Sequence, residues 1–355
     1  MITPVKRVNR FFMLVTAPFI GLLLCLTLYR PSLTLKLETQ RFAPSAGPVQ
    51  LTSGIKDQLD NAQDTATYTI HAVSSSAKRY TETTAAMNAI VDKAKTQAGR
   101  PESIYNRRIT AKLGFPYDTI NSSRITIELY RVNPGSYTGY AMKIKLKDKT
   151  AMTMSLGEGG PGNSETTLQA ANRYGAVAGI NAGGFADQNG KRYPLSTTIV
   201  GGQYLTGFEP SYKDLSFVGL NKNGRLIGGK FHSREQLDEL KPAFGASFVP
   251  VLLQSGYKTE IPAKWEMSPR RAPRTAIGKY KDDQLLIIVA EGYNENGSSG
   301  ATLEELQDKL YRMGVSDAFN LDGGGSTSLV FNGRVVNRPS DGALRPVPTS
   351  FLFFK

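Results

Sequence analysis

The chain has 355 residues, of which 40% are hydrophobic and 21% are charged, and its formal net charge is +13. This composition excludes an intrinsically disordered chain, and the length suffices for one large domain or two smaller ones. The only histidines are His71 and His232 and the only cysteine is Cys25, which excludes a disulfide framework, a histidine-based triad and a multi-histidine zinc site.

The run from Phe11 to Tyr29 carries no charge and is about as long as a helix that spans a bilayer. Basic residues lie just before it, so the positive-inside rule predicts a cytoplasmic N-terminus and an exported remainder. A cleaved signal peptide is the alternative, but Leu26 to Arg30 lacks the small-x-small spacing of a cleavage site. We therefore assign residues 1–30 to a cytoplasmic tip and a retained transmembrane anchor.

Residues 31–105 are rich in Ala, Thr, Ser and Gln and are too poor in large apolar side chains to build a core. Apolar and small residues nevertheless recur every three or four positions from Ile55 to Ala98, which predicts a long amphipathic helix. We interpret this region as a helical stalk or linker that joins copies of the chain into a homo-oligomer through a weak coiled coil. A helix that lies on the C-terminal domain would explain the same stripe.

Residues 106–355 are predicted to form one mixed α/β domain, of the α+β kind, with a mixed β-sheet and flanking helices. The clearest helix begins after Thr302, which forms a capping box with Glu305, and ends at Gly314. Asn332-Gly333 predicts a hairpin turn. The remaining elements follow from alternating or continuous apolar runs: strands at 124–131, 140–146, 176–180, 285–290 and 318–321, and a helix at 164–174.

A strand, the capped helix and a second strand follow one another near the C-terminus, which predicts two parallel strands joined by a right-handed crossover. The first strand ends at Glu291 and the second at Asp322, so both carboxylates leave the same edge of the sheet. Their separation would be roughly 5 to 10 Å, whether the strands are neighbours or have one strand between them. Asn181 follows another predicted strand. Ligands bind at this edge of such sheets, so we expect the three residues to share a site.

Asp322 is followed directly by Gly323, Gly324, Gly325 and Ser326. Successive glycines let a ligand approach the backbone, and their N–H groups can form a nest for an anion such as phosphate. A purely structural turn is the alternative, because Asp and Gly are common turn residues.

Four motifs, taken in order, resemble the phosphodiester glycosidase family, and the resemblance runs from about residue 124 to the end. The motifs are Asn181 to Phe185, Pro273 to Gly278, Asn320 to Ser326, and Asn337 to Gly342 with Arg345 to Thr349. The family implies hydrolysis of glycosyl-1-phosphodiesters such as those of N-acetylglucosamine. One departure stands out: family members tend to carry Asp-Gly-Arg where this chain has Glu291-Gly292-Tyr293, so an acid is kept and an arginine is lost.

With this resemblance, we assign Asp322 as the principal catalytic carboxylate, acting as nucleophile or as base for water, with Glu291 as its partner. Asn181 would orient the sugar or the water. Substrate contacts are assigned to Gly183, Gly184, Arg274, Thr275, Gly323, Gly324, Gly325, Ser326 and Arg345, because arginine forks and backbone donors suit phosphate. Trp265 either stacks on a sugar or belongs to the core. No cofactor is required, although Asp322 and Glu291 could instead hold Ca²⁺ or Mg²⁺.

The sequence therefore predicts a membrane-anchored, extracytoplasmic hydrolase at the cell surface, acting on a sugar-phosphate or phosphate-containing glycan in cell-wall polymer or exopolysaccharide metabolism. Its positive charge would attract anionic lipid or phosphate-rich polymers, or serve only solubility, and we expect no nucleic-acid partner. A non-catalytic glycan-binding or scaffold protein is the alternative function, which the arginine lost after Glu291 keeps open.

Overall fold

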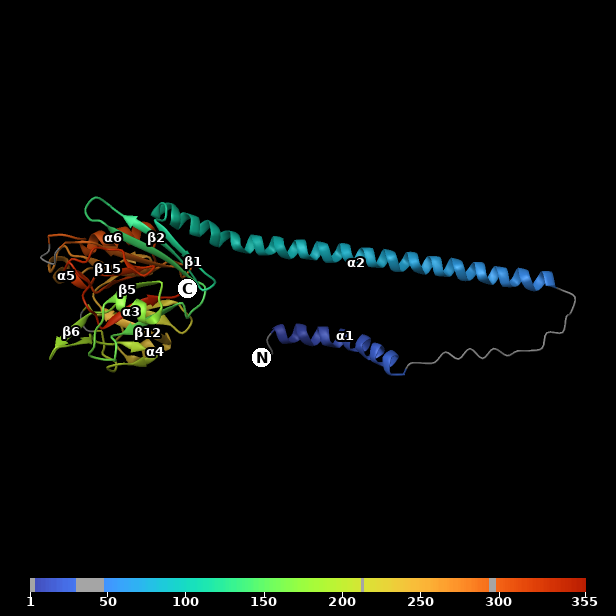
Figure 1. Cartoon of the computed structure of the whole chain (residues 1–355), viewed down its shortest axis with the longest axis horizontal. Helices are drawn as coiled ribbons and strands as arrows, with labels where there is room; N and C mark the ends of the chain where they lie inside the picture. Colours follow the sequence, from blue (N-terminus) through green and yellow to red (C-terminus); the bar gives the residue numbers. More distant parts are fainter. Residues whose placement is uncertain (1–3, 30–47, 212–213, 294–297) are drawn as a thin grey trace. The chain divides into compact units, whose positions relative to one another are not determined.

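The computed structural model describes residues 4–29, 48–211, 214–293 and 298–355 (Figure 1). The chain divides into two compact units, Met1–Ala89 and Ile90–Lys355. Parts of the predicted tip, anchor and stalk fall on residues 1–3 and 30–47, outside the described residues.

In the described part of the chain, α1 (Pro4–Tyr29) is the one helix long and apolar enough to cross a membrane, through Phe11–Tyr29. The described side chains of that span are all exposed. Its length and composition agree with the predicted anchor, and a signal sequence would have the same properties.

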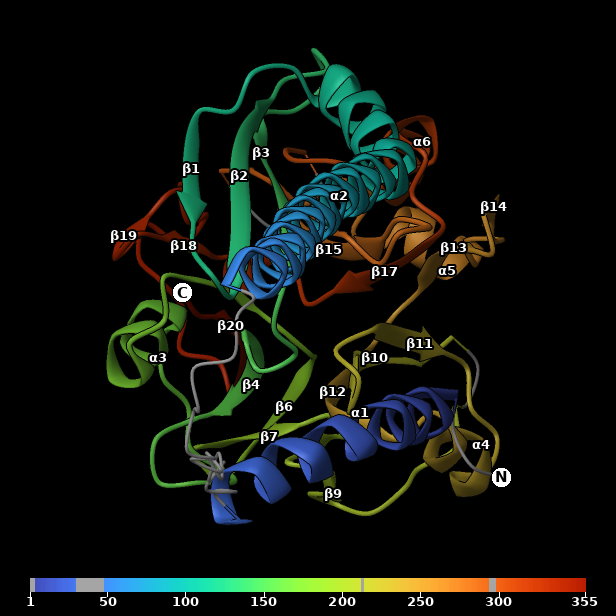
Figure 2. The ribbon, with the colours of Figure 1, turned by 90° about the vertical axis from the view of Figure 1, so that its right-hand side faces the viewer.

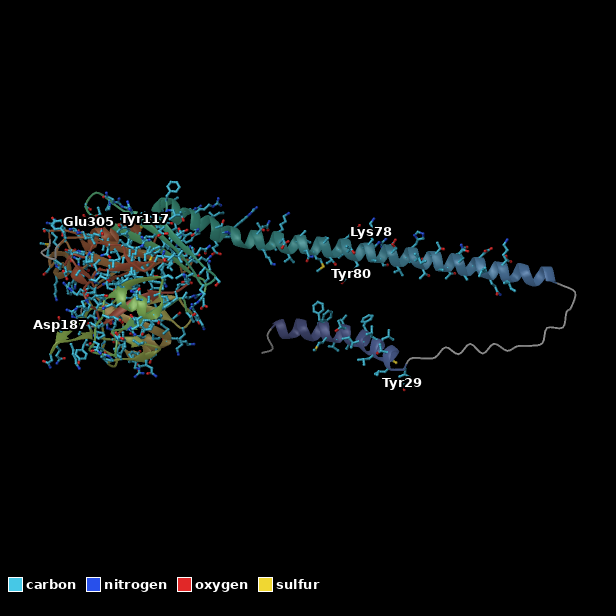
Figure 3. All side chains as sticks on the ribbon, in the orientation of Figure 1. Tyr29, Lys78, Tyr80, Tyr117, Asp187 and Glu305 are labelled. Atoms are coloured by element: carbon cyan, nitrogen blue, oxygen red, sulfur yellow. The ribbon has the colours of Figure 1, made fainter. Side chains whose placement is uncertain are left out.

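The predicted stalk helix is confirmed as α2 (Pro48–Leu113), a single helix of 66 residues. The described side chains of α2 within the first unit are exposed, including the apolar stripe that contains Leu59, Ile70 and Met87. Lys78 and Tyr80, labelled in Figure 3, project from this part of the helix. Whether the stripe joins copies of the chain stays a prediction.

The last turns of α2 belong to the second unit and pack against its core. Tyr105, Ile109 and Leu113, spaced four residues apart on one face, contact the apolar cluster that contains Tyr130 and Tyr280. Lys112 Nζ donates to the carbonyl oxygen of Arg312, 2.9 Å away. The domain boundary that the sequence suggested at residue 106 thus falls inside a continuous helix, whose end lies on the domain.

We expect Ile109→Ala to lower the free energy of unfolding by about 2 to 4 kcal/mol, because Ile109 is 3% exposed and its loss leaves a cavity. The same substitution at Ile90, which lies on the same helix but is 67% exposed, should change stability by no more than about 0.5 kcal/mol. Urea unfolding of a fragment spanning residues 90–355 would measure both. Equal effects would contradict the docking of this helix end.

The second unit contains three sheets of five or more strands, in which each pairing between described strands is antiparallel. The largest is built from β1 (Asp118–Asn121), β2 (Ile125–Val132), β3 (Gly139–Leu146), β13 (Val251–Gln254), β14 (Tyr257–Lys258), β15 (Arg274–Lys279), β16 (Leu285–Ala290) and β17 (Asp317–Leu321). Its order is β1-β2-β3-β16-β15-β17-β13-β14. Figure 2 shows β1, β2 and β3 side by side at one end of it.

The other sheets are smaller. One has the order β11-β10-β12-β8-β9 and contains β8 (Ile199–Val200), β9 (Gln203–Tyr204), β10 (Ser216–Asn221), β11 (Leu226–Gly229) and β12 (Pro242–Phe248). The other has the order β19-β18-β5-β20-β4 and contains β4 (Met152–Leu156), β5 (Ala178–Asn181), β18 (Leu329–Phe331), β19 (Arg334–Val335) and β20 (Thr349–Phe353). A separate hairpin pairs β6 (Phe185–Gln188) with β7 (Lys191–Pro194). The remaining helices are α3 (Thr167–Tyr174), α4 (Arg234–Glu239), α5 (Ala263–Met267) and α6 (Leu303–Met313).

The central strand β16 explains how the core is divided. All six of its residues are buried, as the continuous apolar run predicted. Leu285, Ile287 and Val289 pack into a cluster shared with the two smaller sheets, whereas the alternate residues pack into the cluster under α6 and the end of α2. The large sheet is therefore covered on both faces, and its polar strand ends mark where a site can form.

Several local predictions are confirmed. Thr302 Oγ1 accepts from the Glu305 N–H and Glu305 accepts from the Thr302 N–H, which begins α6, and Gly314 ends it in the left-handed conformation. The hairpin turn at Asn332 and Gly333 has positive φ at both residues. The strand–helix–strand unit exists, but β15 lies between β16 and β17 and pairs antiparallel with both. The two outer strands therefore run in the same direction, as predicted.

Candidate active site

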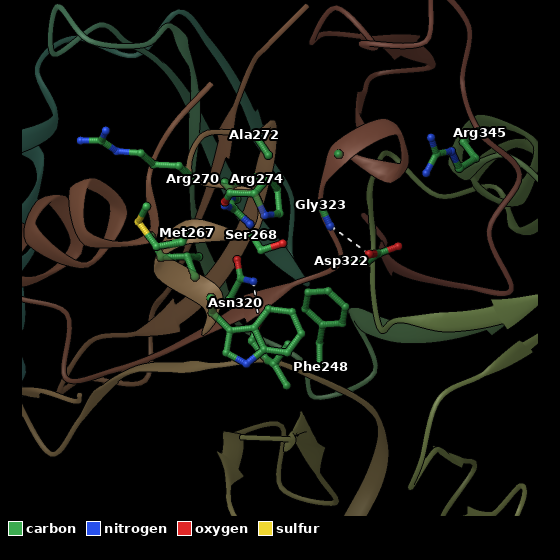
Figure 4. A pocket seen from close by; sticks show the side chains of 15 residues that line it. Phe248, Met267, Ser268, Arg270, Ala272, Arg274, Asn320, Asp322, Gly323 and Arg345 are labelled. Atoms are coloured by element: carbon green, nitrogen blue, oxygen red, sulfur yellow. Dashed lines mark hydrogen bonds between the residues drawn. The ribbon is translucent and has the colours of Figure 1, made fainter. Parts of the chain in front are cut away.

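A cavity of about 700 Å³ lies beside the end of β17, with Asp322 and Gly323 on its wall (Figure 4). Its other walls come from the residues between β12 and β13, from α5, from segment 267–274 that leads into β15, and from Arg345. Arginine, carboxylate, amide and aromatic groups thus meet in one space.

The backbone of Asp322 is held on both sides by residues of the β5 end. The Asp322 N–H donates to the Ala182 carbonyl at 3.1 Å, and Asn181 Nδ2 donates to the Asp322 carbonyl at 2.6 Å. The carboxylate itself accepts from the Gly323 N–H, 3.0 Å from Oδ1, as Figure 4 shows. These bonds fix the direction in which the side chain leaves the turn.

Asn181 does not contact the cavity, which corrects the prediction that it orients a sugar or a water. Its side chain is fully buried, and Oδ1 accepts from Thr275 Oγ1 at 2.8 Å and from the Ser328 N–H at 3.1 Å. Asn181 also belongs to a different sheet from β16 and β17, so the predicted residues do not all leave one sheet edge. The amide joins the two sheets and positions Asp322.

Arg274 and Thr275, both predicted to contact substrate, lie on opposite faces of β15 because side chains alternate along a strand. Thr275 is buried against Asn181, away from the cavity. Arg274 lines the cavity, although only 7% of it is exposed. Its guanidinium donates to the carbonyl oxygens of Pro269, at 2.8 Å, and Ala301, at 3.3 Å.

The charge of Arg274 has no ion-pair partner among the described carboxylates, since its contacts are carbonyl oxygens. Burial lowers the pKa of Arg274 to about 10, so the group stays charged at neutral pH. A buried charge without a counter-ion is costly. An anion in the cavity would offset this cost.

The glycine turn does not form the predicted phosphate nest with its first two N–H groups. The Gly323 N–H donates to Asp322 Oδ1, and the Gly324 N–H donates to the Pro273 carbonyl at 2.8 Å. Gly324 has a φ of 59°, which glycine adopts at little cost. Both N–H groups are therefore used within the fold, one by the Asp322 carboxylate and one by the Pro273 carbonyl.

Arg345 lines the cavity from the C-terminal segment, and its Nη2 lies 2.7 Å from Asp341 Oδ2. A Cβ placed on Gly325 would overlap both groups of this ion pair, so the ends of the Arg345 and Asp341 side chains would have to move to make room for it. Ser326 is buried and does not line the cavity, which corrects its predicted contact with substrate.

We expect Gly325→Ala to raise KM about tenfold, because the new methyl group would displace Arg345 from the cavity wall. Gly54→Ala serves as the control, since a Cβ at that position on α2 meets no atom within 4 Å. Steady-state kinetics on a glycosyl-1-phosphodiester would compare the two. An unchanged KM for Gly325→Ala would contradict a role for Arg345 in binding.

Glu291 does not line the cavity that contains Asp322, and whether the two carboxylates act as a pair stays a prediction. Its Oε1 accepts from the Arg338 N–H at 2.7 Å and its Oε2 from Thr138 Oγ1 at 3.3 Å. Thr138 directly precedes β3, which lies on the far side of β16 from β17. Glu291 accordingly lines a second cavity.

Asp322 lines the first cavity and Glu291 the second, and a divalent cation shared by the two carboxylates stays a prediction. Among the residues that the structure describes, no group of three or more His, Cys, Asp or Glu side chains is placed to hold a metal ion.

Gly183 and Gly184, also predicted to contact substrate, pack against β12. A Cβ on Gly183 would lie 2.6 Å from the Ala246 Cβ, and one on Gly184 would lie 2.6 Å from the Phe248 ring. Both glycines are buried, and neither lines the two cavities. They allow the chain after β5 to pass close to the neighbouring sheet.

Sequence reasoning missed or left open several lining residues. Trp265 lines the cavity and also packs against the core, and its Nε1–H donates to Asp214 at 3.1 Å. Asn320 is 2% exposed and donates through Nδ2 to the Val249 carbonyl, which leaves Oδ1 without a partner among the described residues (Figure 4). Asn320 stands in the same motif as Asp322, two residues earlier. Its position on the strand that leads to Asp322 is the sequence signal that could have identified it as a lining residue.

Comparisons with known proteins agree with this fold. The chain is 29% identical over 202 residues to N-acetylglucosamine-1-phosphodiester alpha-N-acetylglucosaminidase of Bos taurus, covering 52% of this chain and 37% of that protein. It is 30% identical over 199 residues to the SPbeta prophage-derived uncharacterized protein YomE of Bacillus subtilis, covering 53% and 29%. The chain thus spans well under half the length of these curated relatives.

The solved catalytic domain of zebrafish N-acetylglucosamine-1-phosphodiester alpha-N-acetylglucosaminidase has a similar fold, with a TM-score of 0.54 at 20% identity over 68% of this chain and 88% of that chain. The family model for phosphodiester glycosidases matches residues 174–354, just over half of the sequence. That segment contains every residue that lines the first cavity. The chain therefore belongs to the phosphodiester glycosidase family.

Proposed function

We propose that this chain hydrolyses glycosyl-1-phosphodiesters of the N-acetylglucosamine type at the anomeric carbon. The observation that carries the proposal is the buried Arg274, which has no ion-pair partner among the described residues and lines the same cavity as Asp322. The arginine supplies a place for the phosphate, and the carboxylate supplies the group that acts on the sugar. The bovine and zebrafish relatives are named for cleavage of the same bond type.

The leaving group explains how one carboxylate can suffice. Breaking the C1–O bond leaves the electron pair on an oxygen of a phosphomonoester, whose second pKa is about 6, so protonation by a strong general acid is not needed. Arg274 and Arg345 stabilise the charge that develops on this phosphate. Asp322 faces the positive charge on the sugar, either as nucleophile or as the base that takes a proton from water.

The remaining lining groups suit a sugar ring. Trp265 and Phe248 offer aromatic surface in the same cavity, and Asn320 Oδ1 is an acceptor that awaits a donor. A hydroxyl or amide N–H of the sugar would satisfy that buried oxygen, which otherwise costs about 1 to 3 kcal/mol.

Release of N-acetylglucosamine from the methyl ester of N-acetylglucosamine 1-phosphate by the purified chain tests the proposal. In ¹⁸O-labelled water we expect the label in the sugar, because the C1–O bond breaks. Label in the phosphate would instead indicate a phosphodiesterase. Binding that protects the ester from acid hydrolysis, without turnover, would indicate the glycan-binding alternative.

We further propose that α1 anchors the domain outside the cytoplasm, where its excess of basic residues would favour phosphate-rich wall polymers or exopolysaccharide as substrate. Protease treatment of intact cells should release the second unit if this topology holds. Protection of the domain until the cells are lysed would refute it.

The exposed stripe on α2 supports self-association of the stalk. Light scattering of the full chain in detergent should give an oligomer, whereas a fragment spanning residues 90–355 should be monomeric. A monomeric full chain would contradict a stalk that joins copies.

A further inference from the structure

A polar groove of about 480 Å³ lies between the end of α2 and one face of the large sheet, within the second unit. Its walls come from residues 99–106 of α2, from the strands β1, β2 and β3, and from Gln284 before β16. We call it the stalk groove. Every residue that lines it, except Gly99, has a polar side chain. Such walls suit a ligand that is itself polar throughout.

The stalk groove is separate from the active site. None of its residues lines the first or the second cavity. Gln284 directly precedes β16 and Glu291 directly follows it, so the groove lies at the opposite end of this strand, roughly 20 Å from Glu291. Apart from Gln284, its residues precede the segment 174–354 that the family model matches. The groove is therefore built mainly by the part of the chain that joins the stalk to the domain.

Three lysines and two glutamates set the charge of the stalk groove. Lys143, Lys145 and Lys147 occupy alternate positions along β3 and just after it, so they lie on one face, roughly 7 Å apart. Lys143 Nζ lies 2.6 Å from Glu128 Oε2. Lys145 pairs with Glu102 of α2. One positive charge, that of Lys147, is left in excess.

Lys147 is held by neutral groups. Its Nζ donates to Asn121 Oδ1 at 2.8 Å and to the Ser122 carbonyl at 2.6 Å, and it forms no ion pair with a described carboxylate. An ammonium group has three donors, so these two bonds leave one for a ligand. A single excess charge matches a phosphodiester, which carries one negative charge, better than a phosphomonoester, which carries nearly two at pH 7.

A buried acceptor gives an independent indication that the ligand carries hydroxyl groups. Gln284 is 3% exposed, and Asp282 fixes the orientation of its amide, because Nε2 donates to Asp282 Oδ2 at 2.7 Å. Gln284 Oε1 has no hydrogen-bond partner among the described residues. A ligand hydroxyl would supply the missing donor. The oxygens of a phosphodiester cannot do so, because they carry no proton at neutral pH.

We propose that the stalk groove binds a phosphodiester-linked polyol, the chemistry shared by a polyol-phosphate polymer and a glycerophosphate lipid headgroup. The phosphate lies against Lys147, and the hydroxyls bond to Gln284 and to Ser103 of α2. The ligand thus contacts both the helix and the sheet, and its binding strengthens the docking of α2 on the domain. This site goes beyond the proposed hydrolysis and shares no lining residue with the two cavities.

Calorimetric titration of the full chain in an uncharged detergent tests the site with glycerophosphoglycerol, a phosphodiester with a glycerol on each side. Lys147→Gln should raise the Kd about tenfold, because a charge-assisted contact is lost. Lys149→Gln is the matched control, at an exposed lysine two residues further along that does not line the groove, and should leave the Kd unchanged.

Dimethyl phosphate tests the part played by the hydroxyls, because it has the same charge and no hydroxyl group. It should bind the unaltered chain at least tenfold more weakly than glycerophosphoglycerol. Gln284→Met, which keeps the length of the side chain and removes the acceptor, should reduce this difference. An equal Kd for the two compounds in the unaltered chain would contradict a site for a polyol.

The variants also separate this site from the active site. If Lys147→Gln binds glycerophosphoglycerol as tightly as the unaltered chain, or if Arg274→Met abolishes the binding, the stalk groove is not the site. Lys147→Gln should hydrolyse the methyl ester of N-acetylglucosamine 1-phosphate at the unaltered rate. A chain that hydrolyses no ester, yet binds glycerophosphoglycerol through Lys147, would lose the proposed function and keep this site.

Competition identifies the source of the ligand. Displacement of glycerophosphoglycerol by poly(glycerol phosphate), but not by phosphatidylglycerol added to the micelles, would identify a polymer. The reverse result would identify a lipid headgroup. If neither displaces it, the groove does not bind this class of ligand in its natural forms and the proposal is wrong.

Discussion

Asp322→Asn is expected to lower kcat at least a thousandfold in a chain that still folds. The amide has nearly the same shape and can still accept from the Gly323 N–H, so the turn should persist. It cannot act as nucleophile or base, and it cannot balance positive charge on the sugar. Release of N-acetylglucosamine from its 1-phosphate methyl ester would measure the loss.

Asp187→Asn is the matched control, because Asp187 is a carboxylate on the exposed hairpin strand β6 and lines neither cavity. It should retain full turnover. Turnover by a folded Asp322→Asn protein at the wild-type rate would remove Asp322 from the mechanism. The NMR spectrum of the first sugar released by the wild-type chain then separates the two roles: retention indicates a nucleophile and inversion indicates a base for water.

Elements with strong local signals could be predicted from the sequence. The capping box at Thr302, the glycine that ends α6 and the continuous apolar run of β16 each determine their element through neighbouring residues alone. The insertion of β15 between β16 and β17 could not be read in this way, because strand pairing depends on contacts between residues far apart in the sequence.

Part of the candidate site could likewise be predicted from the sequence. Asp322, Arg274 and Arg345 meet in one cavity, as the motifs suggested. Alternation along β15 would already have separated Arg274 from Thr275. The direction of the Glu291 side chain was not predictable from the sequence. It depends on a contact with Thr138, which directly precedes β3, the strand paired with β16.

The glycine turn illustrates the same limit. A run of glycines indicates that the backbone must approach another group closely, but not which group. Here the Gly324 N–H donates to Pro273 and Gly325 makes room for the Arg345–Asp341 pair. Both partners are protein atoms, so the phosphate nest predicted from the motif was wrong for Gly323 and Gly324, whose donors are used within the fold.

Arg274→Met is expected to lower kcat/KM about a hundredfold to a thousandfold, because the charge-assisted contact with the phosphate is lost. The same substitution should raise stability. Burial lowers the pKa of Arg274 to about 10, so below about pH 10 the charge is present in both the folded and the unfolded chain and its burial opposes folding. The penalty would disappear only as the pH rises above about 10 towards the ordinary pKa of arginine.

At pH 7 the lowered pKa of Arg274 corresponds to a penalty of roughly 3 kcal/mol in the free energy of unfolding, which the uncharged Met variant would not have. Loss of the bond to the Pro269 carbonyl offsets about 1 kcal/mol, while the Ala301 carbonyl keeps the bond from the Ala272 N–H. A net gain of about 1 to 2 kcal/mol should therefore appear in urea unfolding at pH 7. Arg270→Met, at an exposed arginine of the same segment, should leave stability within about 0.5 kcal/mol. A less stable Arg274→Met protein that keeps its kcat/KM would show that this arginine serves the fold, and that the cavity does not depend on its charge to hold phosphate.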